Sequence, residues 1–461
     1  MSDSCRTYLL KEDRGREGYA LISVLFLVLL LSALSIIILR VDLYRRRETI
    51  ESLDKVSAGF ASKNGVIAAV EMLDNGIMAD SSFTMNFPDS SHAEVKVFQW
   101  GLYAGVESEG VCHRMESTTS ALLGSTIPSH GSAALVLGNF QHGLTFAGNS
   151  KIIGNVVVGP RGVSIAPLRG ESSPVRIPIE GRLETVSTKI HLFSASTLEQ
   201  EVRNALLLLK GAQRSRMAPE GSDAIECVDG QLDLSDLSDT VREVFSQSDM
   251  AVSGSIMRRG PPLTIVALKH LSILPNTSIV GAVSFYSSDS VAILPRIQLV
   301  SCIIASAKII YVEDGSSFTA QLFAPVIDCQ SNCAANYPSA FVSINLLDST
   351  GIHQSITMLP GSKITGAVVM HVGAGILLQD ATIDIQPGAT VSGEVFDDGY
   401  LTMDGKIDGL VRTFDLYFYD LPTVYLGWLR TGIIDRSSLP EGFLQPIGFL
   451  PNQKAAILTW L

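Results

Sequence analysis

The chain is poor in charged residues. Only 17% of its 461 residues are Asp, Glu, Lys or Arg, and the formal net charge is −12. Proteins that bind nucleic acid usually cluster Lys and Arg on one surface, so this composition argues against a nucleic-acid partner. Because 46% of the residues are hydrophobic, we expect a large buried core and no long disordered segments.

Signatures of catalysis and of metal binding are also missing. The sequence has no G-x-S-x-G, H-E-x-x-H or P-loop pattern, and its eight histidines are spread out. The six cysteines are scattered: Cys5, Cys112, Cys227, Cys302, Cys329 and Cys333. Cys329 and Cys333 lack the further cysteines and partnered His of a zinc module. We expect buried or free thiols with at most one disulfide, and no catalytic, cofactor or metal site.

One stretch lacks charge, Pro and Gly altogether. It runs for 21 residues from Tyr19 to Leu39. At about 1.5 Å per residue, a helix of this length covers about 30 Å, the thickness of a bilayer core. The run is longer than the roughly 7–15 apolar residues of a secretory signal, and no small-x-small cleavage site follows it. We therefore expect residues 19–39 to form a transmembrane helix.

A charged leader precedes this helix. Residues 11–18 read Lys-Glu-Asp-Arg-Gly-Arg-Glu-Gly, and a charged leader that ends in Gly before an apolar helix resembles the type IV prepilin signal. The resemblance to pilins, minor pilins and pseudopilins covers about residues 11–75. It implies that a prepilin peptidase cuts between Gly18 and Tyr19. Ser23 would then be the fifth mature residue, where most family members have Glu, and this departure favours a minor subunit. A plain uncleaved signal anchor is the alternative.

Charge does not decide the orientation in the membrane. Four basic residues precede the helix and four follow it: Arg6, Lys11, Arg14 and Arg16, then Arg40, Arg45, Arg46 and Arg47. The positive-inside rule therefore favours neither side. The pilin resemblance implies a cytoplasmic leader at residues 1–18, a single pass through the inner membrane, and a C-terminal domain in the periplasm or at the cell surface.

Residues 40–78 predict an amphipathic stem that continues the membrane helix. Apolar residues recur at helical spacing: Ile50, Leu53, Val56, Phe60, Ile67, Val70 and Leu73. Asp74-Asn75-Gly76 predicts the end of the helix. In pilins the exposed half of such a helix packs on the globular domain and on neighbouring stems. The alternative is a helix that only lies on its own domain.

The remainder predicts a mainly β protein. Residues 79–130 show short alternating runs of a small antiparallel sheet. Residues 131–412 contain a repeat that reads turn residue, small residue, polar, apolar, any, Gly, any, Val. Its clearest copies begin at Asn149, Asn276, Gly361 and Gly388, and weaker ones span 296–304 and 315–323. This pattern predicts the rungs of a parallel β-solenoid, with an ordinary β-sandwich as the alternative.

The repeat also assigns roles to its positions. The apolar anchors Ile279, Leu299 and Phe318 are 20 and 19 residues apart, and we expect them to stack inside the solenoid with Ile364 and Val391. The first residue, Asn or Gly, would take a positive φ at a corner. The Gly in mid-repeat would lie where a side chain cannot fit, or at a bulge. The longer gaps predict inserted loops, as at residues 330–350.

Two segments depart from the repeat, one inserted within it and one after it. Residues 190–250 predict a helical insertion, in which Ser196 to Glu199 form a capping box and Thr240 to Glu243 start a second helix. Asp233, Asp236 and Asp239 would be helix-start residues. Residues 413–461 are rich in aromatics and predict a cap that covers the last rung. The alternative for these aromatics is a contact site for a partner or a polysaccharide.

The last rung is also rich in aspartates. Asp397, Asp398, Asp404 and Asp408 stand close together, but three of them form Asp-Gly pairs typical of tight turns. We therefore expect a non-enzymatic, membrane-anchored structural protein of the bacterial cell envelope, a pilin-like minor subunit or a surface or periplasmic scaffold. Its expected partners are the lipid bilayer, prepilin peptidase and other pilin-like subunits. The alternatives are an anchored β-solenoid enzyme that cleaves polysaccharide with Asp397 and Asp398, and a cytoplasmic scaffold similar to the bactofilins.

Overall fold

The computed structural model describes residues 6–74, 81–127, 133–168, 170, 173–188, 190–195, 198, 203, 205, 225–227, 230–238, 240–346, 353–373, 375–450 and 453–460, with only the backbone described for 6–20, 225–227 and 259–261. The chain divides into two compact units. The stem unit comprises Met1–Ala68, Ser82–Lys96 and Glu107–Thr119, and the solenoid unit comprises Ala69–Ser81, Val97–Val106 and Ser120–Leu461.

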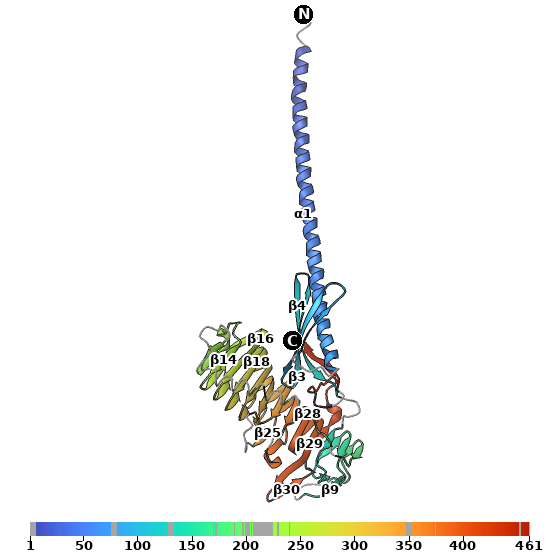
Figure 1. The fold of residues 1–461 in the computed structure, drawn as a ribbon, viewed down its shortest axis with the longest axis vertical. Helices are drawn as coiled ribbons and strands as arrows, with labels where there is room; N and C mark the ends of the chain where they lie inside the picture. The colour runs from blue at the N-terminus through green and yellow to red at the C-terminus, as the bar shows by residue number, and fades with distance from the viewer. Residues whose placement is uncertain are drawn as a thin grey trace. The chain divides into compact units, whose positions relative to one another are not determined.

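The predicted membrane helix and stem are one continuous helix, α1 (Arg6–Asp74), drawn in blue in Figure 1. Its last described residue, Asp74, is where the Asp-Asn-Gly sequence predicts the end of the helix. Between Leu21 and Asp74 the helix is long and apolar enough to cross a membrane, and its apolar window is fully exposed. An exposed helix without a polar face is stable only in an apolar environment, so the geometry agrees with a membrane anchor.

Small residues bring α1 close to a sheet. The strands are β1 (Ser81–Asn86), β2 (His92–Trp100), β3 (Tyr103–Cys112), β4 (Met115–Ser125) and β33 (Ala455–Trp460), and they neighbour one another in this order. A Cβ on Gly110 of β3 would lie 2.1 Å from the backbone oxygen of Ala58 in α1. A Cβ on Gly65 of α1 would lie 2.7 Å from the side chain of Val95 in β2. The helix therefore contacts the sheet through a small-residue face.

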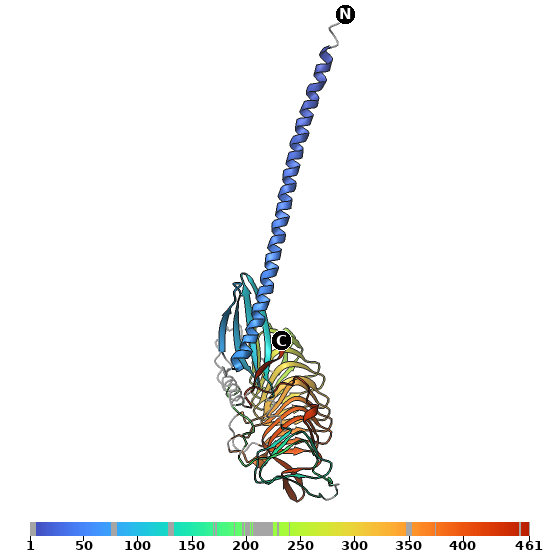
Figure 2. The same ribbon diagram turned by 90° about the vertical axis from the view of Figure 1, so that its right-hand side faces the viewer.

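The solenoid consists of parallel strands in three columns (Figures 1 and 2). Most rungs are one long strand, which supplies the first and second columns, followed by a short strand of the third. The long strands are β16 (Ser255–Ala267), β18 (Ser278–Ser287), β20 (Gln298–Ser306), β22 (Ser317–Ala324), β24 (Ala334–Ser343), β26 (Lys363–Met370), β28 (Thr390–Met403) and β29 (Lys406–Asp420). The short strands are β17 (Leu271–Ile273), β19 (Ser290–Ile293), β21 (Ile309–Val312), β23 (Val326–Cys329), β25 (Gln354–Met358) and β27 (Ala381–Ile385).

The predicted anchors occupy one stack in the first column. Ile279 is in register with Leu299, and Ile364 with Val391. A further rung lies between those of Phe318 and Ile364, and Ala335 is its residue in this stack. The sequence pattern did not predict this rung, because Ala335 is smaller than the other anchors. All of these side chains belong to one continuous buried core. The apolar stack is thus the interior that the period of about 20 residues predicted.

The corner residues of the repeat have the predicted positive φ in three of the four clearest copies. The corner residues Asn276, Gly361 and Gly388 have φ of 65°, 81° and 85°. In the copy that begins at Asn149, the positive φ belongs to the preceding residue, Gly148. The small residue that follows the corner is often a buried hydroxyl: Ser362 Oγ, for example, donates to the oxygen of Leu359 at 2.6 Å. This bond closes the turn three residues back, which explains the small polar residue in the repeat.

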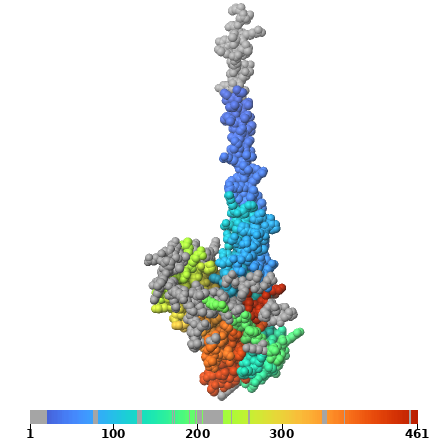
Figure 3. Space-filling model, in the orientation of Figure 1, coloured from blue at the N-terminus to red at the C-terminus, as the bar shows by residue number. Residues whose placement is uncertain are grey.

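One end of the solenoid does not follow the order of the chain. Beyond β29, the first column continues with β32 (Ile433–Asp435), β7 (Lys151–Ile153) and β10 (Ile179–Glu180), and the second with β5 (Leu135–Leu137), β8 (Val156–Val158) and β11 (Leu183–Thr185). The third column ends in a separate sheet of β31 (Trp428–Leu429), β6 (Leu144–Phe146) and β9 (Val163–Ile165). In Figure 3 the teal and green atoms of this early segment lie beside the orange-red atoms of the last rungs. An early segment therefore stacks on the late rungs.

Three expectations about the solenoid need correction. The expected second helix at Thr240 to Glu243 is wrong, because β14 (Glu243–Ser246) and β15 (Met250–Ser253) form a rung there, preceded by β12 (Ile225–Cys227) and β13 (Gly230–Asp233). Residues 413–461 do not close the last rung alone, because β5 pairs with β29. The loop expected at 330–350 is interrupted, since β24 occupies its middle.

The first expected helix lies mostly outside the described residues, although Leu198, Arg203 and Ala205 are helical. Leu198 and Ala205 are buried in a second apolar cluster that covers the outer side of the second column. Trp100, Leu102 and Phe193 belong to the same cluster. The second column is therefore packed on both sides, which explains its nearly continuous apolar sequence.

Candidate functional site

The proposed processing site lies within α1. The backbone of Gly18 and Tyr19 is helical and continuous with the helix from Leu21 that is long and apolar enough to cross a membrane. Their side chains are outside the described part of the chain. The cleavage between these two residues therefore stays a prediction of the sequence.

The part of α1 from Ile50 to Ile67, here called the lower stem, carries a row of apolar side chains that are exposed in the structure. Side chains of Leu53, Val56 and Phe60 are 62%, 52% and 63% exposed, and Ile50 and Ile67 are 57% and 49% exposed. The face of α1 that packs on the sheet uses Ala58, Ala61, Ser62 and Val66 instead, which are at most 2% exposed. The stem therefore shows an apolar row to its surroundings as well as a small-residue face to its own sheet.

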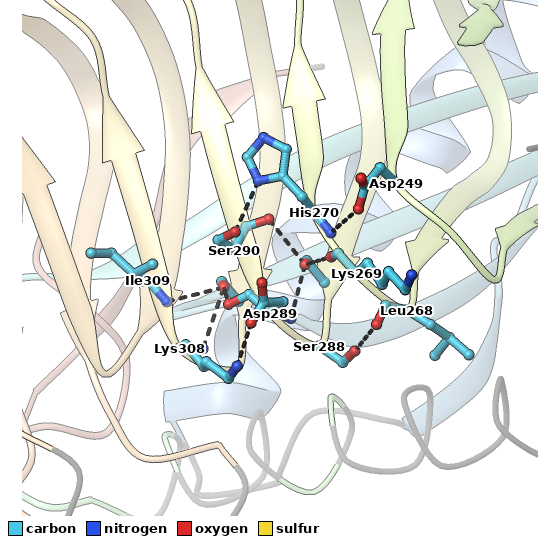
Figure 4. Close-up of polar contacts among 11 residues, drawn as sticks. Asp249, Leu268, Lys269, His270, Ser288, Asp289, Ser290, Lys308 and Ile309 are labelled. Carbon is cyan, nitrogen blue, oxygen red and sulfur yellow. Dashed lines mark hydrogen bonds and ion pairs between the residues drawn. The ribbon is translucent and has the colours of Figure 1, made fainter. Parts of the chain in front are cut away.

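A ladder of polar residues follows the corner between the second and third columns (Figure 4). Ser287 is buried and in register with buried Ser306 of the next rung. The hydroxyl of Ser306 donates to the oxygen of Asp289 at 3.0 Å, and the backbone N–H of Ile309 donates back to that hydroxyl at 3.3 Å. An exposed ion pair of Lys308 with Asp289 joins the same two rungs. These hydroxyls satisfy backbone groups of the tight corner between the two rungs.

His270 lies between two serines of this ladder but does not form a catalytic triad. Its Nδ1 is 2.8 Å from the hydroxyl of Ser290, and its Nε2 is 2.7 Å from that of Ser272. The carboxylate of Asp249 accepts a bond from the backbone N–H of His270 at 3.2 Å, not from the ring. In a Ser-His-Asp triad a carboxylate accepts from the second ring nitrogen of the imidazole, whereas here both ring nitrogens contact serine hydroxyls. The bonds of His270 therefore favour a structural role.

The aspartates of the last rungs are separated by their partners. Asp397 is fully buried, accepts from the hydroxyl of Thr413 at 2.6 Å and from the N–H of Gly399 at 2.7 Å, and burial raises its pKa to about 7. Asp398 is 2.9 Å from Nδ1 of His371. Asp404 forms an ion pair with Arg430, and Asp408 one with Lys406. Because Asp397 cannot meet a polymer without unfolding its corner, the geometry does not present a pair of carboxylates to a polysaccharide.

Glu394 is a buried acid that the sequence did not single out. It is fully buried on the outer side of the second column, and burial raises its pKa to about 8, although Arg412 and Arg436 oppose the shift. The amide of Gln445, oriented to satisfy both partners, donates to both carboxylate oxygens at 2.8 Å. Gln445 comes from the C-terminal segment, so this contact holds a distant segment against β28. In the sequence, the one indication of this buried acid was that Glu394 stands at a position of the repeat where the other clear copies have Ala or Asn.

A second buried acid joins the early segment to β29. Asp415 is 1% exposed, and its Oδ2 lies 2.9 Å from Nδ1 of His142 and 2.7 Å from Nδ2 of Asn139. Burial raises the pKa of Asp415, while the bonds with His142 and Asn139 oppose that effect. The contact links residues more than 270 positions apart. Sequence spacing gives no indication of such a pair.

The aromatic segment packs largely on itself. Phe418 is buried and stacks on Tyr425 with ring centroids 4.5 Å apart, and Arg430 lies over Phe418 at 5.3 Å. Trp428 contacts both rings edge to face. These contacts occupy the faces that a sugar would stack on, so they favour packing over a polysaccharide site. Among the described cysteines, Cys112, Cys302, Cys329 and Cys333 are buried free thiols, as expected.

No protein-family model and no curated protein sequence matches the chain. Among solved structures, an ice-binding protein (LeIBP) from an Arctic yeast is 12% identical over 46% of this chain and 87% of that chain, with a TM-score of 0.19. The competence-associated pilin ComZ from Thermus thermophilus is 10% identical over 89% of this chain and 97% of that chain, with a TM-score of 0.23. An ice-binding protein from an Antarctic Flavobacteriaceae bacterium is 9% identical over 66% of this chain and 94% of that chain, with a TM-score of 0.16. TM-scores this low establish neither a shared fold nor a shared function.

Proposed function

We propose that the protein is a membrane-anchored structural subunit of a pilin-like assembly in a bacterial envelope, not an enzyme. α1 anchors it in the inner membrane, and the solenoid unit lies in the periplasm or at the cell surface. Prepilin peptidase removes residues 1–18, and other pilin-like subunits are the partners. The observation that carries the proposal is the exposed apolar row of the lower stem.

The row has the composition of a helix-packing surface. Phe60 is 63% exposed on the same helix whose opposite face is already buried against β2 and β3. Large apolar side chains at helical spacing lose about 1.5–3 kcal/mol each when they stay in water. A second stem with the same row would cover them, because rows three and four residues apart interlock between neighbouring helices.

Photo-cross-linking in native membranes tests this proposal. A benzoylphenylalanine at position 60 should give adducts between the stem and other helical stems. The same probe in place of Lys55, an exposed position about 140° around the helix from Phe60, should give far fewer. Equal adduct yields at both positions would contradict packing through the apolar row.

The processing step is tested separately on spheroplasts. We expect added protease to digest the solenoid unit from outside and mass spectrometry to find a mature chain that begins at Tyr19. An external solenoid on a chain that begins at Met1 or Ser2 would leave an uncleaved surface protein. A protected solenoid, in spheroplasts whose known periplasmic domains are digested, would overturn the proposal in favour of a bactofilin-like scaffold.

A further inference from the structure

Three side chains of different chemistry meet in the stem unit. Asp54 projects from α1, Cys112 is the last residue of β3, and His113 follows it in the turn to β4. Their oxygen, sulfur and nitrogen atoms all lie within 4.8 Å of one another. Asp54 and Cys112 are nearly 60 positions apart in the sequence, so the packing of α1 on the hairpin brings them together.

The separations match those between the ligands of a tetrahedral metal ion. Asp54 Oδ1 is 3.3 Å from His113 Nδ1, Cys112 Sγ is 3.5 Å from the same nitrogen, and Cys112 Sγ is 3.8 Å from Asp54 Oδ1. With usual zinc bond lengths, a tetrahedral ion separates N from O by about 3.4 Å and S from either by about 3.6 Å. One ion can therefore reach all three atoms with little movement.

Two other His–carboxylate pairs of the same protein serve as an internal comparison. His142 with Asp415 and His371 with Asp398 both close to 2.9 Å, the length of a direct charge-assisted hydrogen bond. The pair of His113 with Asp54 is wider, at 3.3 Å. It is also the only one of these three pairs that has a thiol beside it. The wider spacing is what a shared central ion requires and a direct hydrogen bond does not.

The surroundings suit a structural ion with one position open. The Cys112 side chain is buried, the Asp54 side chain is 19% exposed, and the His113 ring is 65% exposed. The thiol and carboxylate thus form the floor of the site, and the imidazole covers it from the solvent side. His113 has φ of 53°, in the left-handed region of the turn between β3 and β4.

We propose that Asp54, Cys112 and His113 bind one Zn²⁺ ion, with water as the fourth ligand, and that this ion ties α1 to the hairpin of β3 and β4. A thiolate, an imidazole and a carboxylate together select zinc or a similar borderline divalent ion over Mg²⁺ or Ca²⁺. Binding displaces the proton of the Cys112 thiol, which leaves to solvent as the sulfur–zinc bond forms. The inference stands independently of the proposed pilin-like function.

Cobalt substitution in the full-length, detergent-solubilised chain tests the site. After chelator treatment, Co²⁺ should bind at one equivalent and show the thiolate-to-cobalt charge-transfer band and the visible absorption of a tetrahedral ion, and Zn²⁺ should displace it. Cys112→Ser should abolish the charge-transfer band, and Asp54→Asn and His113→Ala should each weaken Zn²⁺ binding by more than about tenfold.

Matched controls use a buried thiol and a His–carboxylate pair elsewhere. Cys302→Ser and His371→Ala should leave the cobalt spectrum unchanged. Zn²⁺ should also protect the hairpin of β3 and β4 from protease in the native chain but not in Cys112→Ser. A charge-transfer band that survives Cys112→Ser, or the absence of stoichiometric binding by a folded native chain, would overturn the proposal.

Discussion

The backbone oxygen of Gly366 occupies the place that a Cβ on Gly393 would take, since the two positions are 1.8 Å apart. The two glycines are in register on adjacent rungs, β26 and β28. Gly409 repeats the relationship on the next rung, where a Cβ would lie 1.7 Å from the oxygen of Gly393. At these bends the chain passes from the first column to the second, and the backbones approach too closely for any side chain.

Gly393→Ala should therefore be strongly destabilising. Because the clash is with backbone rather than with a flexible side chain, we expect a loss of about 3 kcal/mol or more in the free energy of unfolding. Gly315→Ala is the matched control, since Gly315 has φ of 73° but nothing within 4 Å of its Cβ position. The control should cost about 1 kcal/mol. Denaturant unfolding of the detergent-solubilised chain measures both, and equal losses would show that φ alone explains these glycines.

The buried serines of the corner ladder should contribute to stability. Ser343 is fully buried, and its hydroxyl donates to the oxygen of Pro325 at 2.7 Å. Ser343→Ala removes this buried hydrogen bond, although the oxygen keeps the backbone N–H of Ser355 as a donor, so we expect a loss of about 1 kcal/mol. Ser317→Ala, on the exposed side of β22, should change the unfolding midpoint little. A Ser343→Ala variant as stable as the native chain would contradict a stabilising ladder.

Glu394 should make stability depend on pH. Its pKa is raised to about 8 in the folded chain, so between about pH 4.5 and pH 8 the folded state binds this proton more firmly than the unfolded state does. The free energy of unfolding should consequently fall as pH rises through this window, by at most about 1.4 kcal/mol per pH unit from this group. Asp397 contributes in the same direction up to about pH 7.

Glu394→Gln should flatten this dependence. The amide keeps the shape of the side chain but cannot ionise, so the variant should gain stability relative to the native chain as pH rises. Thermal melts at pH 5, 6.5 and 8 (about the limits of the window) measure the slope. Glu107→Gln, at an exposed position of β3, should keep the native slope. An unchanged slope in Glu394→Gln would show that another group titrates.

The junction between β5 and β29 should open before the rest when its core is weakened. Leu135 is fully buried, the N–H of Val411 donates to the oxygen of Ala134, and that of Gly138 donates to the oxygen of Thr413. Leu135→Ala should cost about 2–5 kcal/mol and speed hydrogen exchange at Val411 and Gly138. Leu322→Ala, at a buried position in the middle of the solenoid, should not increase exchange at those amides selectively. Uniform acceleration in both variants would mean that the junction unfolds with the whole.

Local features of the chain were predictable because their causes are local. The span from Tyr19 to Leu39 needs only an apolar run, and the corners at Asn276 and Gly361 need only a residue that accepts positive φ. The stack of Ile279 and Leu299 follows from a constant period. The second expected helix failed because Thr240 to Glu243 has a helix-start pattern that pairing with the adjacent rungs overrides.

The candidate sites were largely unpredictable for the opposite reason. Asp54 and Cys112, Asn139 and Asp415, and Glu394 and Gln445 are each brought together from distant positions. The sequence predicted no metal site because an Asp on the stem and a Cys-His pair in a hairpin show no ligand spacing. Only the packing of α1 on its sheet places their atoms within reach of one ion.

By itself, the sequence determined a long helix apolar enough to cross a membrane and a mainly β solenoid with a rung of about 20 residues. These properties follow from composition and period, which act over a few turns of chain. The tertiary structure alone decided that residues 135–185 stack beyond β29, out of chain order. Every rung presents the same kind of edge, so the repeat specifies how rungs pair but not which rung follows which. The choice depends on contacts such as Asp415 with His142, which exist only once the chain has folded.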